Sequence, residues 1–376
     1  MKKKQLGILA IPEVQTIVSS LLCILVGLVI GYIVLLIINP AGATEAIITV
    51  LKNYFNYPSG PAIMKYLGNT LVKTAPLLMC ALSIQFCYKT GLFNIGAAGQ
   101  YVAGAGASLF LALQLGMPWY VCLIASGLAG AALAFIVGVL KAYANVNEVI
   151  SGIMLNWIGL YTVNMLLTGV KETASPYTVT IASTNPTALL PNMGLDKLFT
   201  NNKYVTIAIP LAIITAIVIW VILNKTVFGY ELQATGFNKD AAKYSGMKEK
   251  KNIILTLVIG GALAGFGAGF LYLTGYEQWS VTQSAVPDMG FNGIAATFLG
   301  GLHPIGTIFA SYFIQHITSG GAYLDKNIYP SQISDLISAI IIYLCGFVLF
   351  FKLFLNKRIR QRVENANAAK EGGEKK

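Results

Sequence analysis

The chain has few side chains of the kinds that carry out acid–base, nucleophilic or metal chemistry. Its only histidines are His303 and His316, and its five cysteines all fall in apolar stretches without the spacing of zinc ligands. No Gly-Lys dipeptide occurs, which excludes an ATP-binding loop of the Walker A type, and the His-Glu-x-x-His and Gly-x-Ser-x-Gly motifs are absent. We therefore predict no catalytic, metal-binding or cofactor-binding residue in this chain.

The polar side chains in or near two glycine-interrupted apolar stretches are amides and hydroxyls. They are Gln85, Asn94, Gln100, Asn156, Asn164, Asn292 and Thr297. The aromatic residues Phe93, Trp157 and Phe291 stand beside three of them. Amides next to aromatic rings suit a neutral, hydrogen-bonding, ring-shaped solute better than an ion, although hydrogen bonds between helices would use the same residues.

One acidic residue close to an apolar stretch allows two interpretations. Glu148 could be a proton-coupling carboxylate, because acids inside a membrane are usually functional. Alternatively, Asn147 caps a helix and Glu148 occupies its first turn, where the helix dipole favours an anion.

The composition indicates a membrane protein. Hydrophobic residues make up 56% of the 376 residues and charged residues 11%, and the mean hydropathy is +0.67. The net charge of +11 is scattered at the ends of apolar stretches rather than gathered in a patch, which argues against a nucleic-acid partner. The lipid bilayer is the expected environment.

Ten apolar stretches are candidate membrane spans. We predict them at residues 17–38, 68–87, 97–115, 119–140, 148–169, 205–223, 253–274, 289–302, 305–320 and 333–355. The fold class is therefore an all-α polytopic membrane protein with about ten transmembrane helices. The first span is longer than the core of a signal peptide, so it is expected to be retained.

The distribution of positive charge predicts the orientation. With the N-terminus inside, 19 of the 26 Lys and Arg residues fall on the inner side, as the positive-inside rule requires. Both termini are then cytoplasmic, and residues 1–362 form the transmembrane domain. Residues 363–376 are expected to form a disordered cytoplasmic tail.

A polar segment at residues 224–252 separates two spans and is predicted to be cytoplasmic. It holds six lysines and three acids. Residues 239–245 favour a short helix, with Asn238 as its N-cap, Asp240 and Lys243 matched to the helix dipole, and Gly246 as its stop. So short a helix is not stable alone in water, so it is expected to dock against another chain.

Two spans are poor helices. Glycines interrupt residues 91–106 and 290–301, and the span 289–302 would be only about 21 Å long as a helix. Each break carries a Phe-Asn pair, Phe93-Asn94 and Phe291-Asn292, and the ten-span arrangement places the first pair on the inner side of the membrane and the second on the outer side. We therefore predict broken helices and two inverted repeats, spans 2–5 and 7–10.

Four ordered motifs resemble the permease subunits of ABC importers. They are Gly91-Leu-Phe-Asn-Ile-Gly-Ala-Ala-Gly-Gln100, residues 147–156, residues 231–246, and Gly290-Phe-Asn-Gly-Ile-Ala through His303-Pro304. The resemblance covers residues 67–355 and is to the branch of branched-chain amino acid, ribose-type sugar and nucleoside permeases, most closely the last. It implies a subunit in the cell membrane that binds no cofactor. Its partners would be two cytoplasmic ATP-binding subunits that use ATP, a second permease, identical or different, and an extracytoplasmic substrate-binding lipoprotein.

Carried over by position, residues 231–246 resemble the segment that couples such permeases to their ATPases, and we call them the coupling segment. Its predicted contact residues are Glu231, Ala234, Gly236, Asn238, Asp240, Ala241, Ala242, Tyr244 and Gly246. The predicted translocation-path residues are Phe93, Asn94, Gln100, Asn156, Phe291 and Asn292. Three positions depart from the family pattern by lacking a charge, namely Ala98, Gln233 and Asn292.

The predicted function is ATP-driven import of a small molecule, with a nucleoside as the solute. A simple sugar or a branched-chain amino acid carried by the same architecture is the first alternative. An ion-coupled secondary carrier that works without an ATPase is the second, although the spans contain almost no acids.

Overall fold

A computed structural model describes residues 12–325 and scattered positions beyond them, namely 328, 329, 336, 339, 340, 343, 344, 347, 350, 351, 353, 354, 356, 357 and 361. Helices make up almost all of the regular structure of these residues, and no β-strand occurs among them. Two isolated β-bridges join Lys171 to Thr178 and Tyr177 to Ser280. The chain divides into two compact units. Unit 2 is residues 52–319, and unit 1 is residues 1–51 together with 320–376.

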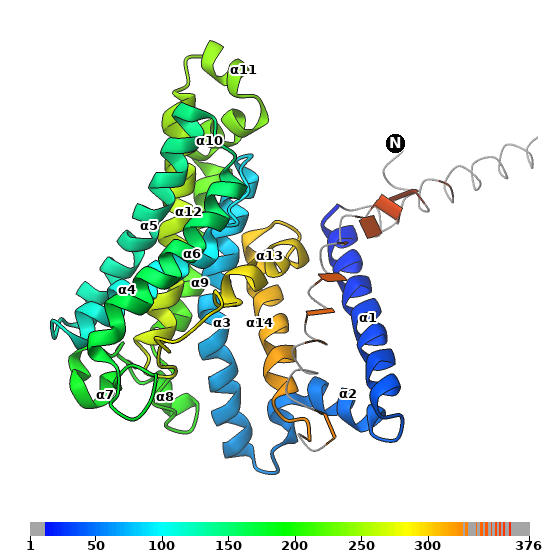
Figure 1. Ribbon diagram of the computed structural model, residues 1–376. Coiled ribbons are helices and arrows are strands. Elements are labelled where there is room, and N and C mark those ends of the chain that lie inside the picture. Colours follow the sequence, from blue (N-terminus) through cyan, green and yellow to red (C-terminus); the bar gives the residue numbers. More distant parts are fainter. Residues whose placement is uncertain are drawn as a thin grey trace, which may run out of the picture. The chain divides into compact units, whose positions relative to one another are not determined.

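Unit 2 contains most of the helices. Its long helices are α3 (Gly60–Lys89), α4 (Ala97–Leu113), α5 (Trp119–Ala144), α6 (Glu148–Leu167), α9 (Ala208–Lys225), α12 (Glu249–Tyr272) and α14 (Pro304–Gly321), the last of which ends just past the unit boundary. Its shorter helices are η3 (Asn53–Asn56), η4 (Thr168–Val170), α7 (Ile181–Thr184), η5 (Pro186–Ala188), α8 (Leu195–Leu198), α10 (Val227–Phe237), α11 (Lys239–Tyr244) and α13 (Met289–Leu299). Figure 1 shows α10 and α11 at one end of unit 2 and α7 and α8 at the other.

Within the described residues, six helices are long and apolar enough to cross a membrane. They are α1 (Pro12–Ile38, from Val18), α3, α5, α6, α9 and α12. The shorter apolar helices α4 and α13 coincide with the two spans predicted to be broken. Nine of the ten predicted spans thus coincide with helices. Most of the tenth, residues 333–355, and the predicted tail at 363–376 lie outside the described residues.

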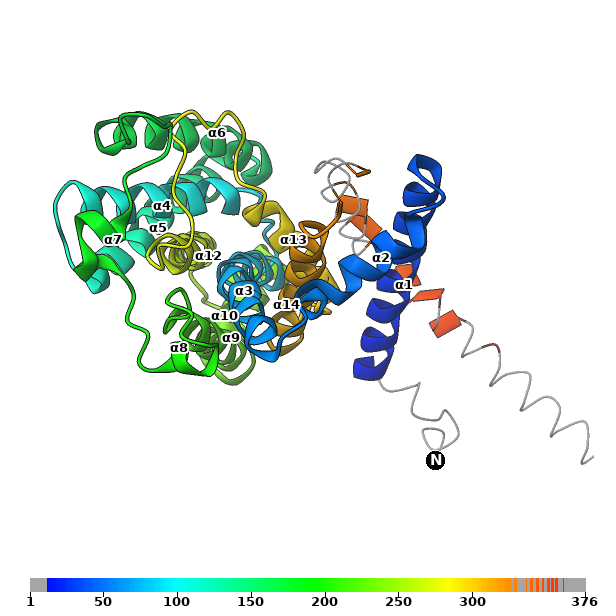
Figure 2. The same cartoon turned by 90° about the horizontal axis from the view of Figure 1, so that it is seen from below.

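The centre of unit 2 is formed by α3 and α12, with α4, α5 and α6 on one side and α9 on the other (Figure 2). Small residues allow α12 to approach its neighbours closely. A Cβ atom on Gly265 would lie 3.2 Å from the Cα of Gly127 on α5, and one on Gly104 of α4 would lie 2.7 Å from the Cα of Gly265. The glycines of α12 therefore serve close helix packing, as small residues do in membrane bundles.

The turn between α5 and α6 settles the local role of Glu148. The Asn147 side chain accepts hydrogen bonds from the backbone N–H groups of Val149 (2.9 Å) and Ile150 (3.3 Å), which makes it the N-cap of α6. Glu148 lies in the first helical turn, and its Oε2 is 2.8 Å from the Nζ of Lys141 at the end of α5. Asn147 thus caps α6, and Glu148 forms an ion pair in its first turn.

At the α7–α8 end, the loop after α12 is anchored by a buried indole. Trp279 is fully buried and donates its ring N–H to Asn164 Oδ1 of α6 over 2.9 Å. Nearby in the same loop, Glu277 forms an ion pair of 2.8 Å with Lys73 of α3, whose ammonium also lies 5.4 Å from the centre of the Tyr276 ring. These contacts hold the loop against α3 and α6.

Unit 1 contains α1 and nearly all of α2 (Ala43–Lys52). Asn39 shapes the turn between them, because its side-chain oxygen accepts hydrogen bonds from the N–H groups of Ala41 and Gly42. The Tyr329 hydroxyl donates to the backbone oxygen of Asn39 over 3.1 Å. The short helices α2, α7 and α8 and the turns η3 and η5 lie between predicted spans, in residues 39–67 and 170–204, whereas η4 overlaps the end of the fifth predicted span.

Candidate coupling and translocation sites

The predicted coupling segment folds as two helices, α10 and α11, joined at one residue. Asn238 ends α10 and caps α11, because its side-chain oxygen accepts hydrogen bonds from the N–H groups of Asp240 (3.1 Å) and Ala241 (3.0 Å). The predicted helix at 239–245 is confirmed as Lys239–Tyr244. The sequence did not indicate α10 as a separate helix, because its residues have no clear apolar stripe.

Gly246 ends α11 in the way its position predicts. It adopts a left-handed φ of +83°, which favours glycine. Its N–H donates to the backbone oxygen of Lys243, and the N–H of Met247 donates to that of Ala242, both over 3.0 Å. This pair of bonds is a Schellman motif, which satisfies carbonyl groups left free at the helix end.

The two faces of α11 differ sharply in exposure. Ala242 is only 4% exposed and packs against the protein itself, so part of the support expected from another chain comes from α10 and α12. On the outside, the rings of Phe237 and Tyr244 are 97% and 95% exposed, and Asp240 and Ala241 are exposed as well. Two almost fully solvent-exposed aromatic rings on a pair of polar helices are typical of a surface that another protein covers.

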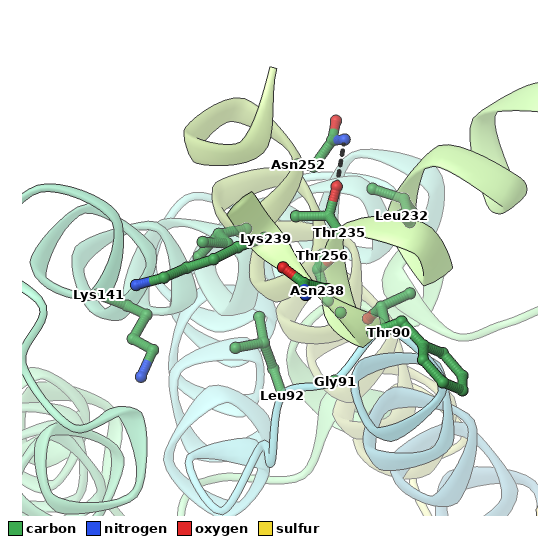
Figure 3. A pocket seen from close by; sticks show the side chains of 13 residues that line it. Thr90, Gly91, Leu92, Lys141, Leu232, Thr235, Asn238, Lys239, Asn252 and Thr256 are labelled. Carbon is green, nitrogen blue, oxygen red and sulfur yellow. Dashed lines mark hydrogen bonds between the residues drawn. The ribbon is translucent and has the colours of Figure 1, made fainter. Parts of the chain in front are cut away.

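Amide side chains tie α10 to its neighbours. Gln233, which lacks the charge common at this position, donates from Nε2 to the backbone oxygens of Leu223 (2.6 Å) and Gly229 (3.3 Å). Asn252 on α12 donates to the Thr235 hydroxyl over 2.9 Å, as Figure 3 shows. These bonds fix α10 to both α9 and α12.

The coupling segment touches the helix break between α3 and α4 through two glycines. A Cβ atom on Gly236 of α10 would lie 2.7 Å from the Gly91 nitrogen and still closer to the backbone of Thr90. A Cβ atom on Gly91, whose φ is +79°, would lie 2.5 Å from the Gly236 Cα. The two backbones are therefore in direct contact, and no side chain larger than hydrogen fits at either position.

Two predicted path residues pair with each other at this break. Asn94 Nδ2 donates to Gln100 Oε1 over 2.8 Å, and Gln100 Nε2 donates back to Asn94 Oδ1 over 3.0 Å. Asn94 also donates to the Ser83 hydroxyl of α3 over 3.0 Å. Both amides are nearly fully buried, so in this conformation they hold the break together rather than face an open space.

Asn156 of α6 performs a similar task for the start of α4. Its Oδ1 accepts a 2.8 Å hydrogen bond from the N–H of Gly99, and its Nδ2 donates to the backbone oxygen of Ile95 over 3.1 Å. The first turn of a helix has N–H groups without intrahelical partners, and α4 has no side-chain cap of its own. Asn156 thus supplies from a neighbouring helix the hydrogen bond that a cap would provide.

The remaining predicted path residues are more accessible. Phe93 is half-buried and lines a cavity of about 490 Å³ beside the coupling segment, together with Glu148 and Phe237. Phe291 is 38% exposed and Asn292 is half-buried at the start of α13. The helices α4, α6 and α13 meet here.

The packing at this meeting point is close. A Cβ atom on Gly290 would lie 2.6 Å from the Ala98 nitrogen, and one on Gly99 would lie 2.6 Å from the Asn156 Cα. Of the predicted path residues, Asn94, Gln100 and Asn156 thus bond to one another's segments at the first turn of α4. The helix α13, which carries Phe291 and Asn292, packs against that turn through Gly290.

A smaller cavity of about 160 Å³ lies between the coupling segment and the ends of α3 and α5 (Figure 3). Its polar lining includes Lys141, Lys239 and Asn238, and it also contacts Gly91 and Gly236. Gly91 was not a predicted site residue, because a contact between segments 145 residues apart leaves no signal in a single sequence. Phe237 and Lys239 lie within the predicted coupling segment but were not among its predicted contact residues.

The fold and these sites define a multi-pass helical membrane protein with a broken-helix centre and a projecting polar segment. A family model described as the permease component of branched-chain amino acid transport systems matches residues 66–346. Because this match covers most of the chain, the protein belongs to that permease family.

Individual relatives agree with this assignment. The nucleoside ABC transporter permease protein of Lactococcus lactis subsp. cremoris is 32% identical, covering 96% of this chain and 99% of that protein. The guanosine ABC transporter permease protein of Bacillus subtilis is 33% identical, covering 74% of this chain and 80% of that protein. The glucose ABC transporter permease protein of Haloferax volcanii is 28% identical, covering 77% of this chain and 78% of that protein.

Proposed function

We propose that this protein is the membrane-spanning subunit of an ATP-driven importer whose solute is a nucleoside. The observation that carries the proposal is the match to a nucleoside permease over nearly the whole length of both chains. A guanosine permease with similar identity supports the same solute class. ATP is hydrolysed by partner subunits, because the sequence has no ATP-binding loop.

Coupling takes place at the exposed face of α10 and α11. Phe237 and Tyr244 would enter a groove of a cytoplasmic ATP-binding subunit, beside Asp240 and Ala241. Movement of α10 would then be transmitted through the Gly236–Gly91 contact to the break that holds Asn94. The polar segment is cytoplasmic in the orientation given by the positive-inside rule, and the α7–α8 end would meet the substrate-binding lipoprotein.

The solute would pass along the outward face of α6, opposite a second permease subunit. Trp157 and Tyr161 are 42% and 58% exposed there, with ring centres 6.2 Å apart and ring planes 26° from parallel. Trp157 lies about 14 Å along a helix that spans about 30 Å, so it is near the middle of the membrane. Contact with lipid tails would leave an indole N–H and a phenol without hydrogen bonds, which favours a protein-lined, wet surface.

The two segments that contain α4 and α13 would be equivalent parts of inverted repeats, spans 2–5 and 7–10. In support, each contains a short apolar helix next to a glycine-rich break, and the two helices pack together through Gly290 and Ala98. Crossing points of broken helices are where transporters of repeated architecture bind their solutes.

A sugar is the second candidate solute, because a glucose permease is also similar over about three quarters of the chain. The test is uptake into vesicles that contain this chain, its two ATPase subunits, the second permease and the lipoprotein. We expect ATP-dependent uptake of labelled guanosine that excess unlabelled nucleoside abolishes and glucose or leucine leaves unchanged. Uptake by the chain alone, driven by a proton or sodium gradient, would refute an ABC importer.

A further inference from the structure

Besides apolar side chains, the lining of the cavity shown in Figure 3 contains two lysines and neutral polar groups but no acid. Of the residues that line it, Lys141 and Lys239 are charged, and no Asp or Glu is among them. The Lys141 ammonium is paired with Glu148, which lines the neighbouring cavity instead. Lys239 forms no ion pair within the described part of the chain, so the cavity has an uncompensated positive charge.

The neutral side chains at this cavity add hydrogen-bond donors. The Asn238 oxygen is used in capping α11, which leaves its Nδ2 group to donate into the surroundings. Thr235 is already engaged, since it donates to the Glu231 backbone oxygen and accepts from Asn252. The available donors are therefore the Lys239 ammonium, the Asn238 amide and the N–H bonds of the Lys141 ammonium that its ion pair with Glu148 does not use.

We propose that this cavity binds a phosphate group, held by Lys239 and Lys141 and by the Asn238 amide. Lysine ammonium groups commonly bind phosphate, where they act as compact point charges. All three arginines of the chain lie at or after position 358, away from this site in the sequence. A volume of about 160 Å³ is that of a cavity known to admit benzene. A phosphate ester group is of similar size.

A bound phosphate would connect the coupling segment to α5. Lys239 belongs to α11 and Lys141 to α5, and the cavity borders the Gly91–Gly236 contact. The phosphate could belong to a small phosphorylated molecule or to an anionic lipid headgroup. The site does not depend on the identity of the transported solute.

Binding can be measured by titrating inorganic phosphate into the purified full-length chain in a maltoside detergent and following ³¹P line width. We expect Lys239→Gln to weaken binding at least about tenfold, since a hydrogen bond to a charged group contributes about that factor. The matched control is Lys243→Gln, which removes the same charge from the same helix but from a residue outside the cavity. The double variant Lys141→Gln/Glu148→Gln removes the second cation without leaving an unpaired acid, and should also weaken binding.

The proposal is overturned if phosphate causes no broadening, or if Lys243→Gln weakens binding as much as Lys239→Gln. It is also overturned if adding the ATPase subunits abolishes binding to the wild-type chain, because the cavity is then part of the subunit interface. Two further arms identify the source. Competition by phosphatidylglycerol in nanodiscs assigns the site to a lipid headgroup. If phosphatidylglycerol does not compete and glycerol phosphate binds, the site is assigned to a soluble phosphate ester.

Discussion

Replacing Gly236 by alanine tests whether the coupling segment acts through the helix break. The new methyl group would lie 2.7 Å from the Gly91 nitrogen and closer still to Thr90. Carbon atoms are at their best separation at about 3.5–4.0 Å, so α10 would have to move about 1 Å away from Thr90 and Gly91. No flexible side chain is available to relieve the clash, because the atoms in the way are backbone atoms.

The expected energetic effect is moderate and the functional effect large. Overpacking of this kind typically costs about 1–3 kcal/mol, while replacing a helical glycine by alanine returns up to about 1 kcal/mol through helix propensity. The fold should therefore persist, with α10 displaced from the break. We expect ATP hydrolysis by the assembled complex to continue while ATP-driven uptake falls at least about tenfold, a change that corresponds to 1.4 kcal/mol.

The assay compares uptake and ATPase rates of the variant complex in the same vesicles. Gly169→Ala is the matched control, because a Cβ at Gly169 would meet nothing within 4 Å, and uptake should remain at the wild-type level. Normal uptake by the Gly236→Ala complex would refute transmission through this contact. Loss of both activities together, with poor assembly, would instead indicate a purely structural contact.

Three further substitutions separate docking from folding. Ala241→Lys, on the exposed face of α11, should weaken ATPase binding in pull-down titrations without changing the melting temperature. Ala242→Lys should instead lower the melting temperature, because its ammonium enters a site that is only 4% exposed. The reverse pattern would contradict this arrangement. Asn238→Ala should cost about 1 kcal/mol of local stability and be seen as faster amide exchange throughout α11, and unchanged exchange would argue against the cap. Asn156→Ala should destabilise the protein by about 1–3 kcal/mol in thermal unfolding, because the buried N–H of Gly99 and the partly buried carbonyl of Ile95 lose their partner. A changed solute preference at normal stability would instead assign Asn156 to the path.

The positions of the helices could be predicted mainly from apolar stretches and from helix-capping residues. The spans ended within a few residues of the observed helices except for α3, which begins at Gly60 rather than near 68. Its first turns hold Lys65 and Tyr66 and are too polar to resemble a span. Local signals also placed α11, because its cap at Asn238 and its stop at Gly246 depend only on neighbouring residues.

The sequence identified the residues of the candidate sites, but it did not predict which residues they contact. The Asn94–Gln100 pair is six residues apart and lies in a recognisable motif, yet its reciprocal bonding depends on how α4 begins. The Asn156 bond to Gly99 and the contact of Gly236 with Gly91 join distant segments. Such contacts follow from packing of whole helices, which a single sequence does not specify.

The helix α3 is long enough to connect the loop after α12 with the coupling segment. Its 30 residues extend about 45 Å, well beyond a hydrocarbon core of about 30 Å. Lys73, which holds the loop after α12 through Glu277, and Thr90, which abuts Gly236, are both on or directly after this one helix, about 25 Å apart along its axis. Because α3 is one continuous helix, a displacement at the coupling segment would reach the ion pair of Lys73 through it. Pro76, which lies between those points, removes one hydrogen bond of this helix and is the place where it would bend most easily.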